Sequence, residues 1–222
     1  AALPSLIAAL AGAARVAITD HPSSPALYGA IQTNISTNIP AAMCDRVSVH
    51  AHEWGVFGTE RGVSGAGGRR GRGGDDNFAA QNRGCFTRII VADCLWMRDQ
   101  HENLVESILW FLAPSSSLQP SLGVEEEEEE TGDKDRDKDV GGGVAWVVAG
   151  FHTGREIVAS FFATAVAKGL VIERIWEQDV NADEGAGAGS TRREWVAMRP
   201  GEGPENRARW CVVAFLRKKG GI

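Results

Sequence analysis

The sequence predicts an α/β protein with a doubly wound, mostly parallel sheet that ends in an antiparallel strand pair. Short apolar runs with the length of strands alternate with segments in which apolar residues recur at helical spacing. The last two strand-like runs have no helical pattern between them, which indicates that they pair antiparallel. With 222 residues, 43% of them hydrophobic, the chain can form one large core. We expect one domain over residues 1–222, with low-complexity inserts at 58–84 and 115–143.

The first half of the chain alternates helix and strand twice. The expected elements are a helix at 3–10, a strand at 16–19 closed by Asp20, a helix at 25–35 and a strand at 47–51. The first helix is rich in Ala and Leu and ends before Gly12. In the second helix, Leu27, Ile31 and Ile35 recur every four positions, so one face should point toward the core.

The second half repeats the alternation and closes with two strands. Its expected elements are a strand at 86–92, a helix that ends at Pro114, a strand at 144–149, a helix that ends at Gly169, and strands at 170–176 and 209–216. The uninterrupted apolar run before Asp93 is typical of a strand buried on both faces. Asp99 with Glu102, and Thr153 with Glu156, match the spacing of a capping box and predict two helix starts.

The two inserts have little apolar content, and the second one accounts for the negative charge of the chain. Residues 58–84 hold 9 glycines in 27 positions, which predicts a flexible loop. Residues 125–139 contribute −7 to a net charge of −6, so the rest of the chain is close to neutral at +1. A nearly neutral domain gives no electrostatic basis for binding nucleic acid or a membrane surface. The short Arg/Gly run at 68–74 resembles RNA-contacting segments but is too short to change that prediction.

Hydropathy and cysteine spacing predict a cytoplasmic protein. No segment approaches the roughly 20 uninterrupted apolar residues of a membrane-spanning helix. The apolar start of the chain lacks a positively charged leader, so we do not expect a signal peptide. The four cysteines are far apart and form no C-x-x-C pair, which favours a reducing compartment over a disulfide framework.

Polar and aromatic residues follow the predicted strands at the edge where α/β sheets bind ligands. Asp20 could accept hydrogen bonds from ribose hydroxyls, although an Asp before Pro22 also suits a plain turn. Trp54 could lie against a planar ligand ring or cap the core. Asp93 and Trp96 place a carboxylate and an indole after the buried strand, where they could meet an amine or could cap backbone and fill core.

Two other residue groups have weaker functional interpretations. His50 and His52 share one face of a strand, but no third ligand is identifiable, so we expect no metal site. Cys94 could be a nucleophile, yet no His and Asp grouping marks it, so an inert buried thiol is the expected state.

Taken together, these motifs resemble the seven-strand S-adenosylmethionine-dependent methyltransferases, which have a Rossmann-like fold. The segments that match are Asp20, Leu27 with Asn34-Ile35-x-x-Asn38, His52-Glu-Trp-Gly55, Ala92-Asp-Cys-Leu-Trp96, Gly150-Phe-His-Thr-Gly-Arg155, and the stretch from Trp176 to Trp210. The pattern is most similar to a fungal branch described as nicotinamide N-methyltransferase-like, related to elongation factor methyltransferase 7 and the protein-lysine methyltransferases.

The resemblance implies a role for each residue at the strand ends. Asp20 would bind the cofactor ribose, Trp54 would lie beside the cofactor, and Ala92 would give a backbone contact near its methionine portion. Asp93 and Trp96 match the acidic-x-x-aromatic motif near the methyl-accepting amine, with Trp in place of the usual Tyr or Phe. The implied cofactor is S-adenosyl-L-methionine. The implied substrate is a protein lysine or N-terminal amine, with translation elongation factor 1-alpha as the expected partner of a monomeric enzyme.

The start of the chain departs from this family pattern. The family opens with a strand at the middle of the sheet and a glycine-rich loop, and Ala1-Ala-Leu-Pro4 resembles only the exit of that loop. We therefore expect the first central strand to be missing, either because the sequence is N-terminally truncated or because the sheet closes in another way. Methylation of nicotinamide, a catalytically inactive binding protein with this fold, and an NAD-dependent oxidoreductase remain as alternatives.

Overall fold

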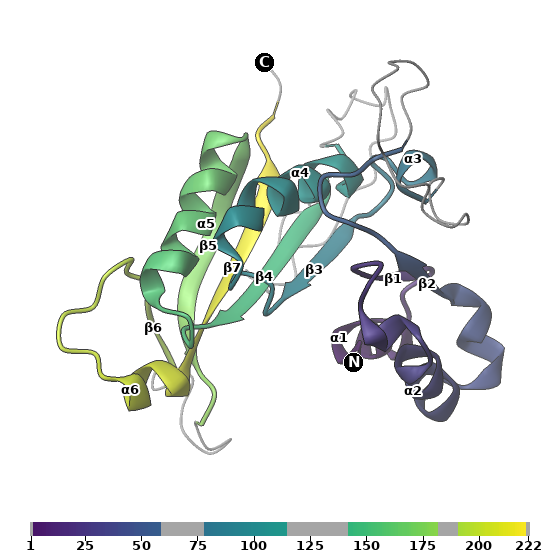
Figure 1. The fold of residues 1–222 in the computed structure, drawn as a ribbon, viewed down its shortest axis with the longest axis horizontal. Coiled ribbons are helices and arrows are strands. Elements are labelled where there is room, and N and C mark those ends of the chain that lie inside the picture. The colour runs from purple at the N-terminus through teal and green to yellow at the C-terminus, as the bar shows by residue number, and fades with distance from the viewer. Residues whose placement is uncertain (1, 59–77, 115–141, 182–190, 221–222) are drawn as a thin grey trace, which may run out of the picture.

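The computed structural model describes residues 2–58, 78–114, 142–181 and 191–220 (Figure 1). The strands in this part of the chain form two sheets that share no hydrogen bonds with each other. β1 (Val16–Asp20) and β2 (Val47–Ala51) form a parallel pair. The second sheet has the order β3-β4-β7-β5-β6. Its strands are β3 (Arg88–Ala92), β4 (Val144–Gly150), β5 (Leu170–Asp179), β6 (Arg192–Glu194) and β7 (Trp210–Lys218).

The strand directions agree with a mixed α/β sheet of the Rossmann-like kind. β3 and β4 pair parallel, and β7 runs antiparallel between β4 and β5, so β3, β4 and β5 share one direction. The antiparallel pairing of β5 with β7 confirms the prediction for the end of the chain. The short β6, which pairs antiparallel with β5, was not predicted.

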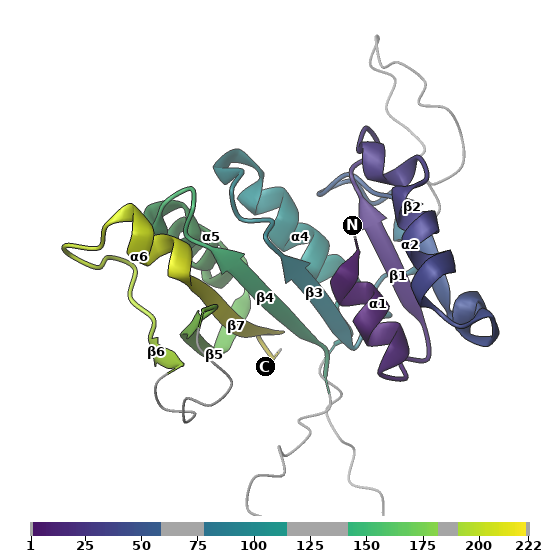
Figure 2. The same cartoon turned by 90° about the horizontal axis from the view of Figure 1, so that it is seen from below.

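Helices lie on both sides of the strands (Figures 1 and 2). They are α1 (Leu3–Leu10), α2 (Ala30–Asn38), α3 (Phe78–Gln81), α4 (His101–Phe111), α5 (Arg155–Ala167) and α6 (Pro204–Arg209), with short 3-10 turns at Pro25–Leu27, Ala41–Arg46 and Arg98–Gln100. In Figure 2, α1 lies across the space between β1 and β3. Among the described helices, none has both the length and the apolar character needed to cross a membrane.

Two apolar clusters form the body of the fold. The larger one packs α4 and α5 against the second sheet, with Val105, Phe161 and Val147 fully or almost fully buried. The smaller one joins α1, β1 and α2 through Leu6, Ile18 and Ile31. Each sheet therefore has its own core.

Several predicted boundaries were wrong at helix starts. α4 begins at His101 and α5 at Arg155, and their N-cap residues, Gln100 and Gly154, make no side-chain capping bond. Both predicted capping boxes are therefore incorrect. The expected helix at 25–35 is divided at Gly29, whose φ of 122° ends the first turn before α2 begins.

Two other predictions need correction because tertiary contacts override the local pattern. The end of the expected flexible insert forms α3, in which Phe78 is buried against Phe111, while residues 59–77 lie outside the described part of the chain. The insert at 115–143 lies outside it as far as residue 141. β3 is buried on one face only, because Val91 is 3% exposed whereas Arg88, Ile90 and Ala92 on the other face are exposed.

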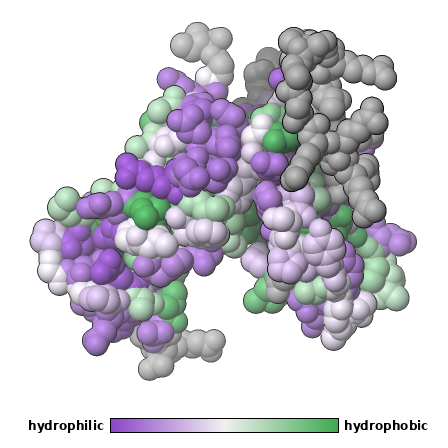
Figure 3. All heavy atoms as spheres, in the orientation of Figure 1, coloured by the Kyte–Doolittle hydropathy of each residue, from purple (hydrophilic) through white to green (hydrophobic). Residues whose placement is uncertain are grey.

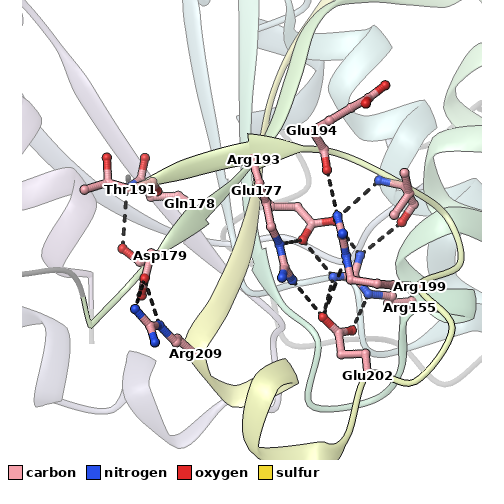
Figure 4. A network of polar contacts seen from close by, with 11 residues as sticks. Arg155, Glu177, Gln178, Asp179, Thr191, Arg193, Glu194, Arg199, Glu202 and Arg209 are labelled. Atoms are coloured by element: carbon pink, nitrogen blue, oxygen red, sulfur yellow. Dashed lines mark hydrogen bonds and ion pairs between the residues drawn. The ribbon is translucent and has the colours of Figure 1, made fainter. Parts of the chain in front are cut away.

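A buried network of ion pairs links α5, β5, β6 and the loop before α6 (Figure 4). Glu177 on β5, which is fully buried, accepts hydrogen bonds from Arg155 at 2.6 and 2.8 Å and from Arg193 at 2.6 Å. Glu202 binds the same two guanidinium groups. Burial alone would raise the pKa of Glu177, but the bonds from Arg155 and Arg193 outweigh it and hold that pKa below its usual value.

Candidate functional site

A cavity of about 810 Å³ lies between β1 and β3 and extends past their carboxyl ends. Its walls are most of β1 and β3, the N-terminal turn of α1, the segments that follow β1, β2 and β3, and one face of α4. Figure 3 shows the surface hollowed between the block that carries β1 and β2 and the block of the second sheet. Sheets of this class bind their ligands at this edge.

Asp20 lies at the end of β1 and lines the cavity. One carboxylate oxygen accepts a hydrogen bond from the N–H of His21 at 2.8 Å, and the other accepts one from the hydroxyl of Ser24 at 2.8 Å. The turn role that the sequence left open is therefore present. Each carboxylate oxygen can accept a further hydrogen bond, so Asp20 can still bind hydroxyl groups of a ligand.

Trp54 reaches the cavity on a turn that α4 holds in place. The N–H of Gly55 donates to the hydroxyl of Ser107 at 2.9 Å, and that hydroxyl lies 3.3 Å from Nε2 of buried His52. Gly55 has a φ of 81°, and a Cβ there would lie 2.9 Å from Oδ1 of Asn103. Only glycine fits this position without strain, so the Trp-Gly pair is a structural unit.

Residues 92–94, at the end of β3 and just after it, lie on two different surfaces. Ala92 and Cys94 line the cavity, whereas Asp93, between them, is not among its lining residues. The side chain of Asp93 is 65% exposed, and its carboxylate lies 3.9 Å from Nδ1 of His152. The φ of Asp93 is 54°, a left-handed value that residues other than glycine seldom adopt and that Asp tolerates better than most.

The cavity wall is acidic and aromatic. Besides Asp20, the carboxylates of Glu53 and Asp99 line it, and no Lys or Arg does so among the described residues. Trp54 and Trp96 supply two indoles, and Trp96 is 51% exposed. Carboxylates and indole faces both attract cations, so the electrostatics favour a positively charged ligand.

The structure therefore brings Asp20, Trp54, Ala92 and Trp96 to one cavity and places Asp93 next to it. Sequence reasoning gave no role at this site to Glu53, Asp99 or Ser107. Glu53 stands close to a predicted strand end, and that position is a signal that could have found it. Asp99 lies in the 3-10 turn ahead of α4, where the sequence suggested a capping role instead. Ser107 is different, because only the packing of α4 against the turn at Gly55 shows its contact.

His50, His52 and Cys94 were the other candidates for a chemical role, and each is packed against other side chains or buried. His50 stacks on Phe78 with the ring centroids 4.1 Å apart, and burial lowers the pKa of His52. Among the described residues, no group of three or more His, Cys, Asp or Glu side chains could hold a metal ion. Burial, with smaller effects of Asp93 and Asp20, raises the pKa of Cys94 to about 11, which favours the inert thiol. All four cysteines are free thiols.

Many proteins with a Rossmann-like sheet bind nucleotides or cofactors beyond the ends of the parallel strands, where this cavity opens. No family model matches the chain. The chain is 30% identical over 112 residues to the protein N-terminal and lysine N-methyltransferase EFM7 of Candida glabrata. This match covers 50% of the chain and 38% of the length of that curated relative. The similarity supports a relationship to methyltransferases.

Proposed function

We propose that this chain belongs to an S-adenosylmethionine-dependent N-methyltransferase that acts in the cytoplasm, as a monomer, on a protein lysine or N-terminal amine. The observation that carries the proposal is the single cavity in which Asp20, Trp54, Ala92 and Trp96 meet. The similarity to a protein N-terminal and lysine methyltransferase supports the choice of a protein amine over nicotinamide. Translation elongation factor 1-alpha is the proposed substrate.

The residues on the cavity wall fit a cationic nucleotide. When bound, S-adenosylmethionine supplies an electrophilic methyl group on a sulfonium. Asp20 would accept hydrogen bonds from ribose hydroxyls with its remaining lone pairs. Trp54 would cover one side of the nucleotide, and the backbone of Ala92 would contact its amino-acid portion. The acidic wall, free of Lys and Arg among the described residues, suits a positive charge.

The chemistry asks mainly for alignment of the acceptor. Methyl transfer breaks the carbon–sulfur bond and forms a carbon–nitrogen bond, and the amine must present a free lone pair along that line. Asp93, exposed beside the cavity, would orient the amine by accepting one of its hydrogen bonds. The indole of Trp96 would attract the positive charge that develops on the nitrogen. The proton leaves to solvent.

A labelled-methyl assay with the full chain tests this proposal. At saturating cofactor, we expect label in elongation factor 1-alpha and none in nicotinamide. Asp20→Asn should weaken cofactor binding about tenfold, since it halves the acceptor capacity toward hydroxyls. Asp45→Asn, at an exposed position outside the cavity, is the matched control. Label in nicotinamide alone would contradict the proposal.

A second candidate, a binding protein without catalysis, is favoured by the break between β1 and β3. The sheet is interrupted next to the proposed cofactor site, so this second candidate predicts weak binding of S-adenosylmethionine to the chain. Isothermal titration calorimetry measures it. Absence of both binding and label transfer would select the second candidate, and tight binding would exclude it.

A further inference from the structure

The loop after β3 carries both residues that the proposed function assigns to the methyl-accepting amine. The side chain of Asp93 is 65% exposed and Trp96 is 51% exposed. Between them stands Leu95, which is 2% exposed and belongs to the main core. Because Asp93 and Trp96 lie within two residues of Leu95, the directions of their side chains depend on how Leu95 is held.

His101, the first residue of α4, holds Leu95 from the side away from the cavity. Nε2 of His101 lies 2.9 Å from the backbone oxygen of Leu95, and the residue is 2% exposed. Because a carbonyl oxygen only accepts hydrogen bonds, Nε2 must carry a proton and donate it. Cys94 and Trp96 line the cavity, whereas Leu95 and His101 are not among its lining residues. The contact therefore fixes the loop from its buried side.

The imidazole of His101 is held in turn by α5. Its Nδ1 lies 3.1 Å from the hydroxyl oxygen of Ser160, and that hydroxyl also lies 2.8 Å from the backbone oxygen of Ile157. The ring meets Phe161 edge to face, with the ring centroids 5.6 Å apart. A polar contact at one nitrogen sets the direction of the other nitrogen of an imidazole. α5 thereby aims Nε2 at Leu95.

Two features distinguish this contact from ordinary core packing. A polar ring in the core costs free energy unless it is hydrogen-bonded, so what His101 adds over an apolar residue is a directed bond to the loop. The backbone of Asp93, with a φ of 54°, is a conformation that persists only when its surroundings hold it. The bond from His101 to Leu95 lies two residues away and supplies part of that support.

On the basis of the function proposed above, we infer that His101 is a positioning residue for the methyl-accepting amine. It acts through the backbone of Leu95 on Asp93 and Trp96, and it takes no part in proton transfer. Methyl transfer tolerates little misalignment of the acceptor, so loss of this bond should slow the reaction even when the chain stays folded.

Amide hydrogen exchange tests whether the bond holds the loop, without any need for methyl transfer. The N–H groups of Asp93 and Gln100, at the two ends of the loop, make backbone hydrogen bonds of 2.7 and 3.1 Å. In the full chain, His101→Leu should speed exchange of both amides at least about tenfold, because Leu95 loses its donor. His101→Gln should restore slow exchange, since its side-chain amide can donate to the same carbonyl.

Leu216→Ala is the matched control for general destabilisation. Leu216 is fully buried on β7 and pairs with Ala145, toward the opposite end of the sheet from the loop. The control should speed exchange of the Val144 N–H, which donates to Thr87 at 3.0 Å, more than that of the Asp93 N–H. Equal effects of this control and the leucine variant on Asp93 would overturn the proposal.

Nitrogen-15 NMR of the His101 imidazole checks the assigned proton. We expect a proton on Nε2, where the backbone oxygen of Leu95 accepts it. A proton on Nδ1 alone would leave that oxygen without its donor and would overturn the proposal.

Kinetics with the full chain test what the loop position is for. His101→Leu should lower kcat for the protein acceptor at least about tenfold, while the dissociation constant of S-adenosylmethionine changes less than about twofold. His101→Gln should recover most of kcat, and Leu216→Ala, assayed below its unfolding temperature, should keep it. An unchanged kcat in His101→Leu would overturn the proposal. If the unmodified chain transfers no methyl group, the proposed function fails, and the exchange result alone decides whether His101 positions the loop.

Discussion

The hydroxyl of Ser107 on α4 lies 3.3 Å from Nε2 of His52 on the segment after β2. The same hydroxyl accepts a hydrogen bond from the N–H of Gly55. These two contacts join the main core beneath α4 to the turn that carries Trp54 to the cavity. A helix of the second sheet thereby sets the position of a residue that follows the first sheet.

Ser107→Ala should destabilise the protein by about 1–3 kcal/mol, because it leaves a buried imidazole nitrogen and a backbone N–H without their partner. Urea unfolding followed by circular dichroism measures the change. Ser36→Ala is the control, since the hydroxyl of Ser36 is exposed and its loss should cost less than about 0.5 kcal/mol. An equal effect of the two substitutions would show that the Ser107 contacts contribute no stability.

Gly55→Ala should destabilise the fold for two separable reasons. The φ of 81° is strained for any residue with a Cβ, at roughly 1–2 kcal/mol, and that Cβ would also crowd Asn103. Gly169→Ala isolates the first cause, because Gly169 has a φ of 102° and open space around it. Asn103→Ala in the Gly55→Ala background should recover part of the loss in thermal unfolding. No recovery would mean that crowding plays no part.

Glu177 should make the protein sensitive to acid. Its pKa in the folded state is held below the ordinary value of 4.5, so its contribution is complete above that pH and is lost as the pH falls through the folded pKa. Glu177→Gln should cost about 3–5 kcal/mol at pH 7, because buried Arg155 loses one of its two carboxylate partners. It should also flatten the dependence of stability on pH below 4.5. Denaturant unfolding at several pH values measures both effects.

Glu173→Gln is the matched control for the acid experiment. Glu173 pairs with Arg217 at 2.9 Å, but its side chain is 38% exposed, so the substitution should change stability by no more than about 1 kcal/mol. A pH profile for Glu177→Gln that matches the unmodified protein would assign acid sensitivity to other carboxylates.

Cys94 should react slowly with alkylating reagents although it lines the cavity. With a pKa of about 11, only about one thiol in a thousand is ionised at pH 8, and the thiolate is the reactive form. Iodoacetamide labelling followed by mass spectrometry should modify exposed Cys85 well before Cys94. Faster labelling of Cys94 would indicate an activated thiol and would reopen a nucleophilic role.

The sequence predicted the strands better than the ends of the helices. Apolar runs such as the one at β4 are short and uninterrupted, so their limits are visible from residue type alone. The capping-box pattern at Asp99 failed because that residue lies in a 3-10 turn ahead of α4 and lines the cavity. Phe78 looked like part of a loop because its partner, Phe111, is far away in sequence.

At the candidate site, the sequence by itself determined which residues stand at strand ends, because strand length and direction place Asp20 and Ala92 at the same edge. Only the tertiary structure decided which of them share a cavity. Asp93 follows Ala92 directly, yet its left-handed backbone turns it toward His152. The family resemblance led us to expect a missing central strand, but only the tertiary structure shows that β1 and β3 share no hydrogen bonds, since pairing between strands depends on which edges meet in space.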